Sequence, residues 1–236
     1  SDDGMGYFNS AYNIYVGFYM IATTGLPVAL SRMIAVSNAQ GNRAEVKRIF
    51  NLSLLIFFVL GLVSGLVMFF WAKGLAGVVA NSNAYLSIMA IAPTIFFICL
   101  ASSYRGYFQG LQDMVPTAVS QVIEALGKLG IGIIAGLYAV SQGYGLAVVA
   151  AYSISGITIG VAVGTIYLFI TKAIIRDSFL NPEPEVVMPV KSRGSIVKEL
   201  IYIALPITIS TSLLSLTNII DLMIMMRRLQ HIGFSE

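Results

Sequence analysis

Six long runs of apolar residues dominate the chain, and shorter polar segments separate them. The runs cover approximately residues 8–30, 50–71, 85–103, 117–140, 146–171 and 200–226. Each is close to the roughly 20 residues that an α-helix needs to cross about 30 Å of hydrocarbon. None alternates apolar and polar positions as a half-buried strand does. The pattern predicts an all-α polytopic membrane protein with about six transmembrane helices.

The composition strengthens this prediction. Of the 236 residues, 57% are hydrophobic and only 11% are charged, against about 25% charged residues in an average soluble domain. The net charge is +3, and in a membrane protein such a balance usually reflects Lys and Arg in cytoplasmic loops. We therefore expect membrane lipids as partners and no nucleic acid.

Basic residues gather after the first, third and fifth runs. They are Arg32, Arg43, Lys47 and Arg48 after the first, Arg105 after the third, and Lys172, Arg176, Lys191, Arg193 and Lys198 after the fifth. These alternate loops are predicted to be cytoplasmic, so the first run enters from outside. That direction fits a fragment whose preceding helix is missing. Arg227 and Arg228 fall on the external side, so either the last run is misplaced or both face a polar cavity.

The longest loop predicts a division into two bundles. It contains the segment 181–189, NPEPEVVMP, whose prolines prevent a continuous helix. We interpret residues 1–176 as most of one six-helix lobe, 177–199 as a cytoplasmic linker, and 200–236 as the first helix of a second lobe. The remainder of the same chain is then its expected partner.

Small residues at helical spacing predict close helix packing. They are Gly61 and Gly65, Gly132 and Gly136, and Gly156, Gly160 and Gly164. Such spacing lets two backbones approach closely inside a bilayer. Pro27, Pro93 and Pro206 lie within apolar runs, where each removes a backbone hydrogen bond and favours a kink.

The sequence lacks the signatures of an enzyme. It has no nucleophile paired with a base, no metal-binding cluster, no phosphate-binding loop and no GxGxxG motif. We therefore expect no enzymatic activity and no cofactor, with sodium or a proton as a coupling ion.

Polar residues within the apolar runs are the candidate functional residues. Gln121, Glu124 and Lys128 share one face of the fourth run, and the spacing of Glu124 and Lys128 allows them to form an ion pair. A structural pair and a role in substrate passage both remain open. Asn218 and Asp221 in the last run form a candidate proton or sodium site, or Asp221 pairs with another helix.

Two further features have alternative interpretations. Arg32 either extends its long side chain to the membrane interface or binds a phosphate at a cavity mouth. Tyr12, Tyr15 and Tyr19 share one helix face, which either packs against neighbours or stacks on sugar rings.

Four stretches resemble the stage V sporulation protein B branch of bacterial polysaccharide transporters. They are GMGYFNSAYNIY, GLPVALSRMIAVSNAQGN, YRGYFQGLQDMVPTAVSQVIEALGK and NIIDLMIMMRRLQHIGFSE. The branch belongs to the multidrug/oligosaccharidyl-lipid/polysaccharide exporter superfamily, which includes lipid II flippases. The resemblance implies two six-helix lobes around a central cavity, in the bacterial cytoplasmic membrane. It makes this chain the second to seventh helices.

The resemblance also implies a substrate, a lipid-linked oligosaccharide or peptidoglycan precursor. In related flippases, cavity arginines hold the lipid-linked pyrophosphate, and an acidic residue of the seventh helix, most like Asp221 here, helps to bind sodium. The predicted substrate-binding residues are Arg32, Arg105, Gln121, Glu124, Lys128, Arg227 and Arg228. Asn218 and Asp221 are the predicted ion-coupling residues. The alternatives are a cation-coupled drug exporter and a non-transporting membrane scaffold.

Overall fold

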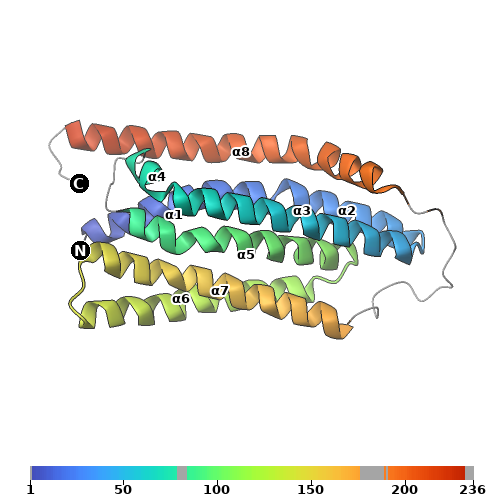
Figure 1. Ribbon diagram of the computed structural model, residues 1–236, viewed down its shortest axis with the longest axis horizontal. Helices are drawn as coiled ribbons and strands as arrows, with labels where there is room; N and C mark the ends of the chain where they lie inside the picture. Colours follow the sequence, from blue (N-terminus) through green and yellow to red (C-terminus); the bar gives the residue numbers. More distant parts are fainter. Residues whose placement is uncertain (1, 79–83, 176–188, 190, 232–236) are drawn as a thin grey trace.

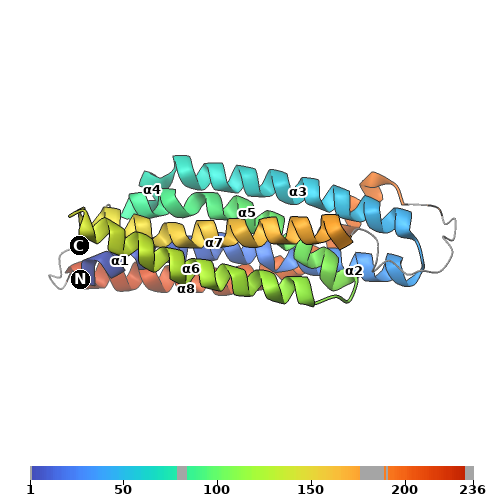
Figure 2. The ribbon, with the colours of Figure 1, turned by 90° about the horizontal axis from the view of Figure 1, so that it is seen from below.

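The computed structural model describes residues 2–78, 84–175, 189 and 191–231. Their helices are α1 (Asp2–Thr23), α2 (Gly25–Ala39), α3 (Arg43–Phe70), α4 (Ala72–Val78), α5 (Tyr85–Gly110), α6 (Val115–Ser141), α7 (Leu146–Ile175) and α8 (Arg193–His231). No strand occurs in these ranges. The all-α prediction is therefore confirmed, and the long helices lie side by side along one axis (Figures 1 and 2).

Helix α5 is the centre of the bundle. Helices α1, α2 and α3 pack on one side of it and α7 on another, while α6 packs mainly on α7 and α8 on α1 and α2 (Figure 1). Its side chains are buried along most of its length, including Ile88, Ile95 and Phe108. A helix that is apolar on all sides is stable in such a central position.

The outer faces of the bundle are apolar, as a bilayer requires. Leu55, Val63 and Leu66 of α3 are exposed, as are Leu126 and Ile134 of α6. Five helical segments in the described ranges are long and apolar enough to cross a membrane, and they correspond to the first five predicted runs. The chain is therefore a multi-pass membrane protein.

The first predicted run is a broken helix. It divides at Thr24 into α1 and α2, because Pro27 has no N–H to donate to the carbonyl of Thr23. The Thr24 hydroxyl donates to the Met20 carbonyl at 2.6 Å, in the last turn of α1. Beyond the break, α2 lies against two glycines of α5, and a Cβ on Gly110 would come within 2.7 Å of the Ser31 carbonyl oxygen.

Two other boundaries differ from the predicted ones. Helix α5 continues to Gly110, beyond the predicted end at residue 103, so Arg105 lies in a helix and is only 7% exposed. The prediction that Arg105 belongs to a loop was wrong, because a charged residue was taken as the end of the apolar run. Helix α8 begins at Arg193, within the predicted linker, and continues through Pro206. Residues 177–188 and 190 of that linker lie outside the described residues.

Glycines join α6 and α7 closely, as their spacing predicts. A Cβ on Gly132 would come within 2.8 Å of the Ser153 carbonyl oxygen, and a Cβ on Gly160 within 2.9 Å of the Glu124 carbonyl oxygen. Only glycine leaves room for backbones at this separation. The two helices consequently form one closely packed unit (Figure 2).

Threonines of α7 bind the backbone of α5 around Pro93. The Thr158 hydroxyl donates to the Ala90 carbonyl at 2.8 Å and lies 2.7 Å from the Thr94 hydroxyl. Two helical turns further along α7, the Thr165 hydroxyl lies 3.1 Å from the Phe97 carbonyl oxygen and 2.7 Å from the Val161 carbonyl oxygen of its own helix. Both contacts with α5 join a side chain of one helix to the backbone of another, as hydroxyls often do between membrane helices. Helix α5 is thus fastened to the α6–α7 unit.

Candidate substrate cavity

A cavity of about 430 Å³ lies between α1, α6 and α7. Its lining combines a row of tyrosines, polar residues of α6 and apolar residues: Tyr12, Tyr15, Val16, Tyr19, Met20, Gln121, Glu124, Ala125, Lys128, Ile157 and Val161. It is bounded by three of the membrane-spanning segments. A polar cavity at this depth gives ionised side chains a place that the surrounding lipid does not.

The tyrosines of α1 form a continuous aromatic wall. Neighbouring ring centroids are 5.9 Å apart for Tyr12 and Tyr15, and 5.7 Å apart for Tyr15 and Tyr19, and both pairs are tilted. Residues three and four positions apart share a helix face, so the predicted common face is confirmed. This tyrosine face lines the cavity, and each ring combines an apolar surface with a polar hydroxyl.

Glu124 forms an ion pair with Arg105 across the α5–α6 contact. Arg105 also donates from Nε to the Ser120 hydroxyl at 3.1 Å, and the two charged side chains are 8% and 16% exposed. Ser120 lies one turn before Glu124, so both contact the same guanidinium. The spacing had allowed a Glu124–Lys128 pair instead. In the structure Glu124 pairs with Arg105, because α5 brings a buried guanidinium to it.

Gly164 of α7 makes room for this ion pair. A Cβ at this position would come within 3.0 Å of Glu124 Cγ and 3.1 Å of the Ser120 carbonyl oxygen. The third glycine of the α7 series therefore shapes the site as well as the helix packing. Ser120 and Gly164 were not among the predicted site residues. The four-residue spacing from Ser120 to Glu124 is the signal that would have found the serine.

Lys128 lies one turn beyond Glu124 and faces the tyrosines. Its Nζ is 4.6 Å from the centroid of the Tyr12 ring and 3.4 Å from the Tyr12 hydroxyl oxygen. In the described part of the chain, Lys128 contacts this tyrosine and forms no ion pair. Gln121 and Lys128 thus reach the cavity with Glu124, as their shared face predicts.

The other predicted site residues lie away from the cavity, or their side chains are not among those that the structure describes. Arg32 is exposed on α2 and does not line the cavity. Asp221 is exposed on α8, and no group of three His, Cys, Asp or Glu residues gathers in the described ranges. The predicted sodium site and ion-coupling role of Asp221 stay a prediction. The side chains of Asn218, Arg227 and Arg228 lie outside the described residues.

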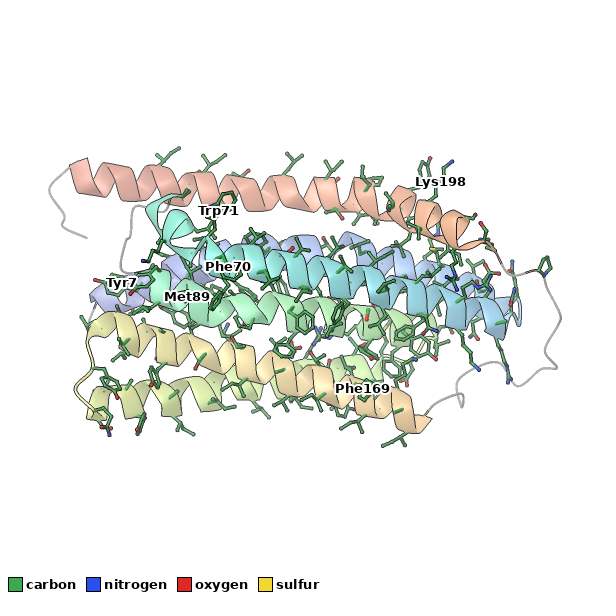
Figure 3. All side chains as sticks on the ribbon, in the orientation of Figure 1. Tyr7, Phe70, Trp71, Met89, Phe169 and Lys198 are labelled. Carbon is green, nitrogen blue, oxygen red and sulfur yellow. The ribbon has the colours of Figure 1, made fainter. Side chains whose placement is uncertain are left out.

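A second polar cluster occupies the basic end of the bundle, where α2 meets α3 and α8 begins (Figure 1). Glu45 accepts a 2.9 Å hydrogen bond from the Asn42 amide and lies 3.7 Å from Lys191 Nζ. Lys191 also binds Glu199 at 2.8 Å, and its carbonyl accepts from Arg48 at 3.2 Å. Figure 3 shows Lys198 on the outer side of α8 at this end, and Trp71 near the opposite end.

A family model described as polysaccharide biosynthesis protein matches residues 1–233. The chain belongs to this family. Among its relatives, stage V sporulation protein B of Bacillus subtilis (strain 168) is 30% identical over 213 residues, covering 88% of this chain and 39% of that protein. Lipid II flippase MurJ of the same strain is 28% identical over 178 residues, covering 71% and 32%. This member of the polysaccharide biosynthesis protein family thus spans less than half of either relative.

A solved structure has the same fold. It is an inward-facing multidrug resistance MATE family transporter of the MOP superfamily, with a TM-score of 0.67 and 17% identity. The match covers 91% of this chain and 47% of that one. Together these findings confirm the predicted family and fold class, and the location as a multi-pass protein of the cytoplasmic membrane.

Proposed function

We propose that this chain forms most of one lobe, and the first helix of a second, of a flippase for a lipid-linked oligosaccharide or peptidoglycan precursor. The observation that carries the proposal is the cavity of about 430 Å³ between three membrane-spanning segments, whose lining includes Gln121, Glu124 and Lys128. Family membership and the similarity to a lipid II flippase support it. The proposal is a transport function and not an enzymatic one.

The physical task of such a flippase matches the chemistry of the cavity. A lipid-linked glycan has polar sugars and an anionic phosphate linkage, and neither enters hydrocarbon without a large loss of hydration. The Tyr12 and Tyr15 hydroxyls and the Gln121 amide offer hydrogen bonds in place of water. The lipid tail stays in the bilayer, so the protein shelters only the head group.

Alternating access would complete the transport cycle. Two lobes that rock against each other expose one central site first to one side of the membrane and then to the other. A proton or sodium gradient, or the membrane potential, would drive the cycle, at about 2.3 kcal/mol per charge per 100 mV. Asp221 and Asn218 are the proposed coupling residues. Loss of any sodium or pH dependence of transport in Asp221→Asn, with transport itself retained, would support that assignment.

The test uses the full-length protein in vesicles that contain a fluorescent lipid-linked glycan. We expect the protein to increase the rate at which the labelled head group crosses the bilayer, relative to empty vesicles. Arg32→Ala and Arg227→Ala then test the predicted substrate path, and unchanged rates would remove both residues from it. A wild-type protein that gives the rate of empty vesicles would contradict the proposal and favour a scaffold.

One observation favours a second candidate, a cation-coupled drug exporter. The Glu124 carboxylate lines the cavity, and a carboxylate at such a site can attract an organic cation. Its pairing with Arg105 offsets that attraction. Binding of a fluorescent organic cation that lipid-linked glycan does not displace would favour the exporter. Binding of the glycan alone would favour the flippase.

A further inference from the structure

Two cationic side chains reach the region of the cavity, and their surroundings differ. Arg105 is buried and paired with the Glu124 carboxylate, so the two charges cancel locally. Lys128 has no carboxylate within ion-pair distance among the described residues, and it faces the Tyr12 ring and hydroxyl. Arg105, Glu124 and Lys128 together leave one positive charge, and Lys128 is the cation of the three that lines the cavity without an ion-pair partner among the described residues.

The charge of Lys128 lies deep in a membrane-spanning helix. It lies about 20 Å along α6 from Val115, at 1.5 Å per residue, which is near the middle of the helix. An ammonium at this depth is costly unless a partner or water compensates it. A tyrosine ring compensates it weakly, because the ring offers only its quadrupole and one hydroxyl oxygen. An anion in the cavity would be a much stronger partner.

We propose, on the basis of the flippase function above, that Lys128 recognises the phosphate linkage of the lipid-linked glycan. Its ammonium has three N–H donors on a flexible stem, so it can turn from Tyr12 to a phosphate oxygen without breaking an ion pair. The Tyr12 hydroxyl, released from Lys128, donates a second hydrogen bond to the same group. Arg105 is a positioning residue, which holds Glu124 and Ser120 of α6 in place.

This assignment gives Lys128 and Arg105 different roles, although the sequence predicted that both bind substrate. A phosphate that approached Arg105 would have to displace Glu124, which leaves a carboxylate unpaired beside a second anion. Approach to Lys128 displaces only a contact with a neutral ring. The cavity therefore selects an anionic head group through α6 and the tyrosine wall, and not through the guanidinium.

The experiment measures binding to the full-length protein in detergent by three fluorescent ligands with the same disaccharide and prenyl chain. One has a pyrophosphate linkage, one a monophosphate linkage and one a neutral glycosidic linkage. We expect Lys128→Met to weaken binding of the pyrophosphate ligand about tenfold or more, because it removes a charge-assisted contact. Binding of the neutral ligand should not change, and this also shows that the variant is folded.

Two further variants sharpen the result. Lys128→Arg keeps the charge and should restore binding of the pyrophosphate ligand to within about threefold of wild type. Lys73→Met is the matched control, because Lys73 Nζ also lies over a tyrosine ring, 5.8 Å from the Tyr85 centroid, but does not line the cavity. It should leave all three affinities unchanged.

The outcomes distinguish this inference from the proposed function. If wild type prefers the pyrophosphate ligand and Lys128→Met keeps that preference, the assignment of Lys128 is wrong and the flippase proposal stands. If Lys73→Met loses the preference to the same extent, the effect is not specific to the cavity and the assignment also fails. If wild type binds none of the three ligands, the flippase proposal fails, and the assignment with it.

Discussion

Ion pairs in the described part of the chain lie in two regions, and their surroundings differ. Inside the bundle, Arg105 and Glu124 are almost fully buried between membrane-spanning helices. At the basic end, Lys191 joins Glu45 and Glu199 with 44% of its side chain exposed. Water competes for the second set and hardly reaches the first. The same chemistry should therefore matter much more for stability inside the bundle than at its end.

The largest effect should come from breaking the buried ion pair. Glu124→Gln leaves the Arg105 guanidinium buried without its counter-charge, which typically costs about 3–5 kcal/mol. Thermal unfolding in detergent would measure the loss. The double variant Glu124→Gln with Arg105→Met is the control, and it should recover most of the loss because no charge remains buried. Equal stability of the single variant and wild type would show that water reaches the pair.

The next effect should come from the glycine contact between α6 and α7. Gly160→Ala places a Cβ within 2.9 Å of the Glu124 carbonyl oxygen, and such overpacking costs about 1–3 kcal/mol. Gly130→Ala is the matched control on α6, because a Cβ there meets nothing within 4 Å. Unfolding temperatures of the two variants make the comparison. Similar values would mean that α6 and α7 are not held closely together.

A smaller effect should come from the Thr158 hydroxyl, which contacts α5 near Pro93. Thr158→Val removes the hydrogen bond to the Ala90 carbonyl, and such bonds in membrane proteins contribute about 0.6 kcal/mol on average. Thr171→Val is the control, because among the described residues its hydroxyl bonds within its own helix, to the Tyr167 carbonyl. Chemical unfolding of both variants in detergent tests the difference. A larger loss for Thr171→Val would contradict the role of the α5–α7 bond.

The smallest effect should come from Lys191 at the basic end. The hydrogen bond to Glu199 raises the pKa of Lys191 above its ordinary value, and the charge of Glu45 adds to this. A raised pKa means that the stabilisation is present at neutral pH and is lost as the pH rises through the folded-state value. Because the group is exposed, Lys191→Met should cost at most about 1 kcal/mol, and less at high salt. Unfolding measured across salt concentrations checks this; a salt-independent loss would contradict it.

The sequence predicted the helices better than their ends. Apolar runs of membrane-spanning length located five spans correctly, because the bilayer constrains length and polarity together. The sequence prediction wrongly placed Arg105 in a loop. A charged residue inside a long helix looks like a loop residue until its partner is known. That partner, Glu124, lies on another helix, and pairing between helices is not encoded in local spacing. For the same reason the i,i+4 rule suggested Lys128 instead.

Repeated spacings of glycine and tyrosine predicted contacts more reliably, because residues three or four positions apart share one face of a helix. The glycine series of α6 and α7 predicted a close contact, and the helices meet along it. The tyrosine spacing of α1 predicted a common face, which lines the cavity. Neither pattern could reveal Gly164 as part of the Glu124 site, because that depends on how two helices are aligned along their lengths.

The break at Thr24 gives the two halves of the first span different packing. Beyond it, α2 is held against α5, where Gly110 leaves no room even for a methyl group. Before it, α1 presents Tyr12 and Tyr15 to the cavity. Under the flippase proposal, we expect α1 to tilt about Thr24 to admit a head group wider than the cavity, while α2 stays packed against α5.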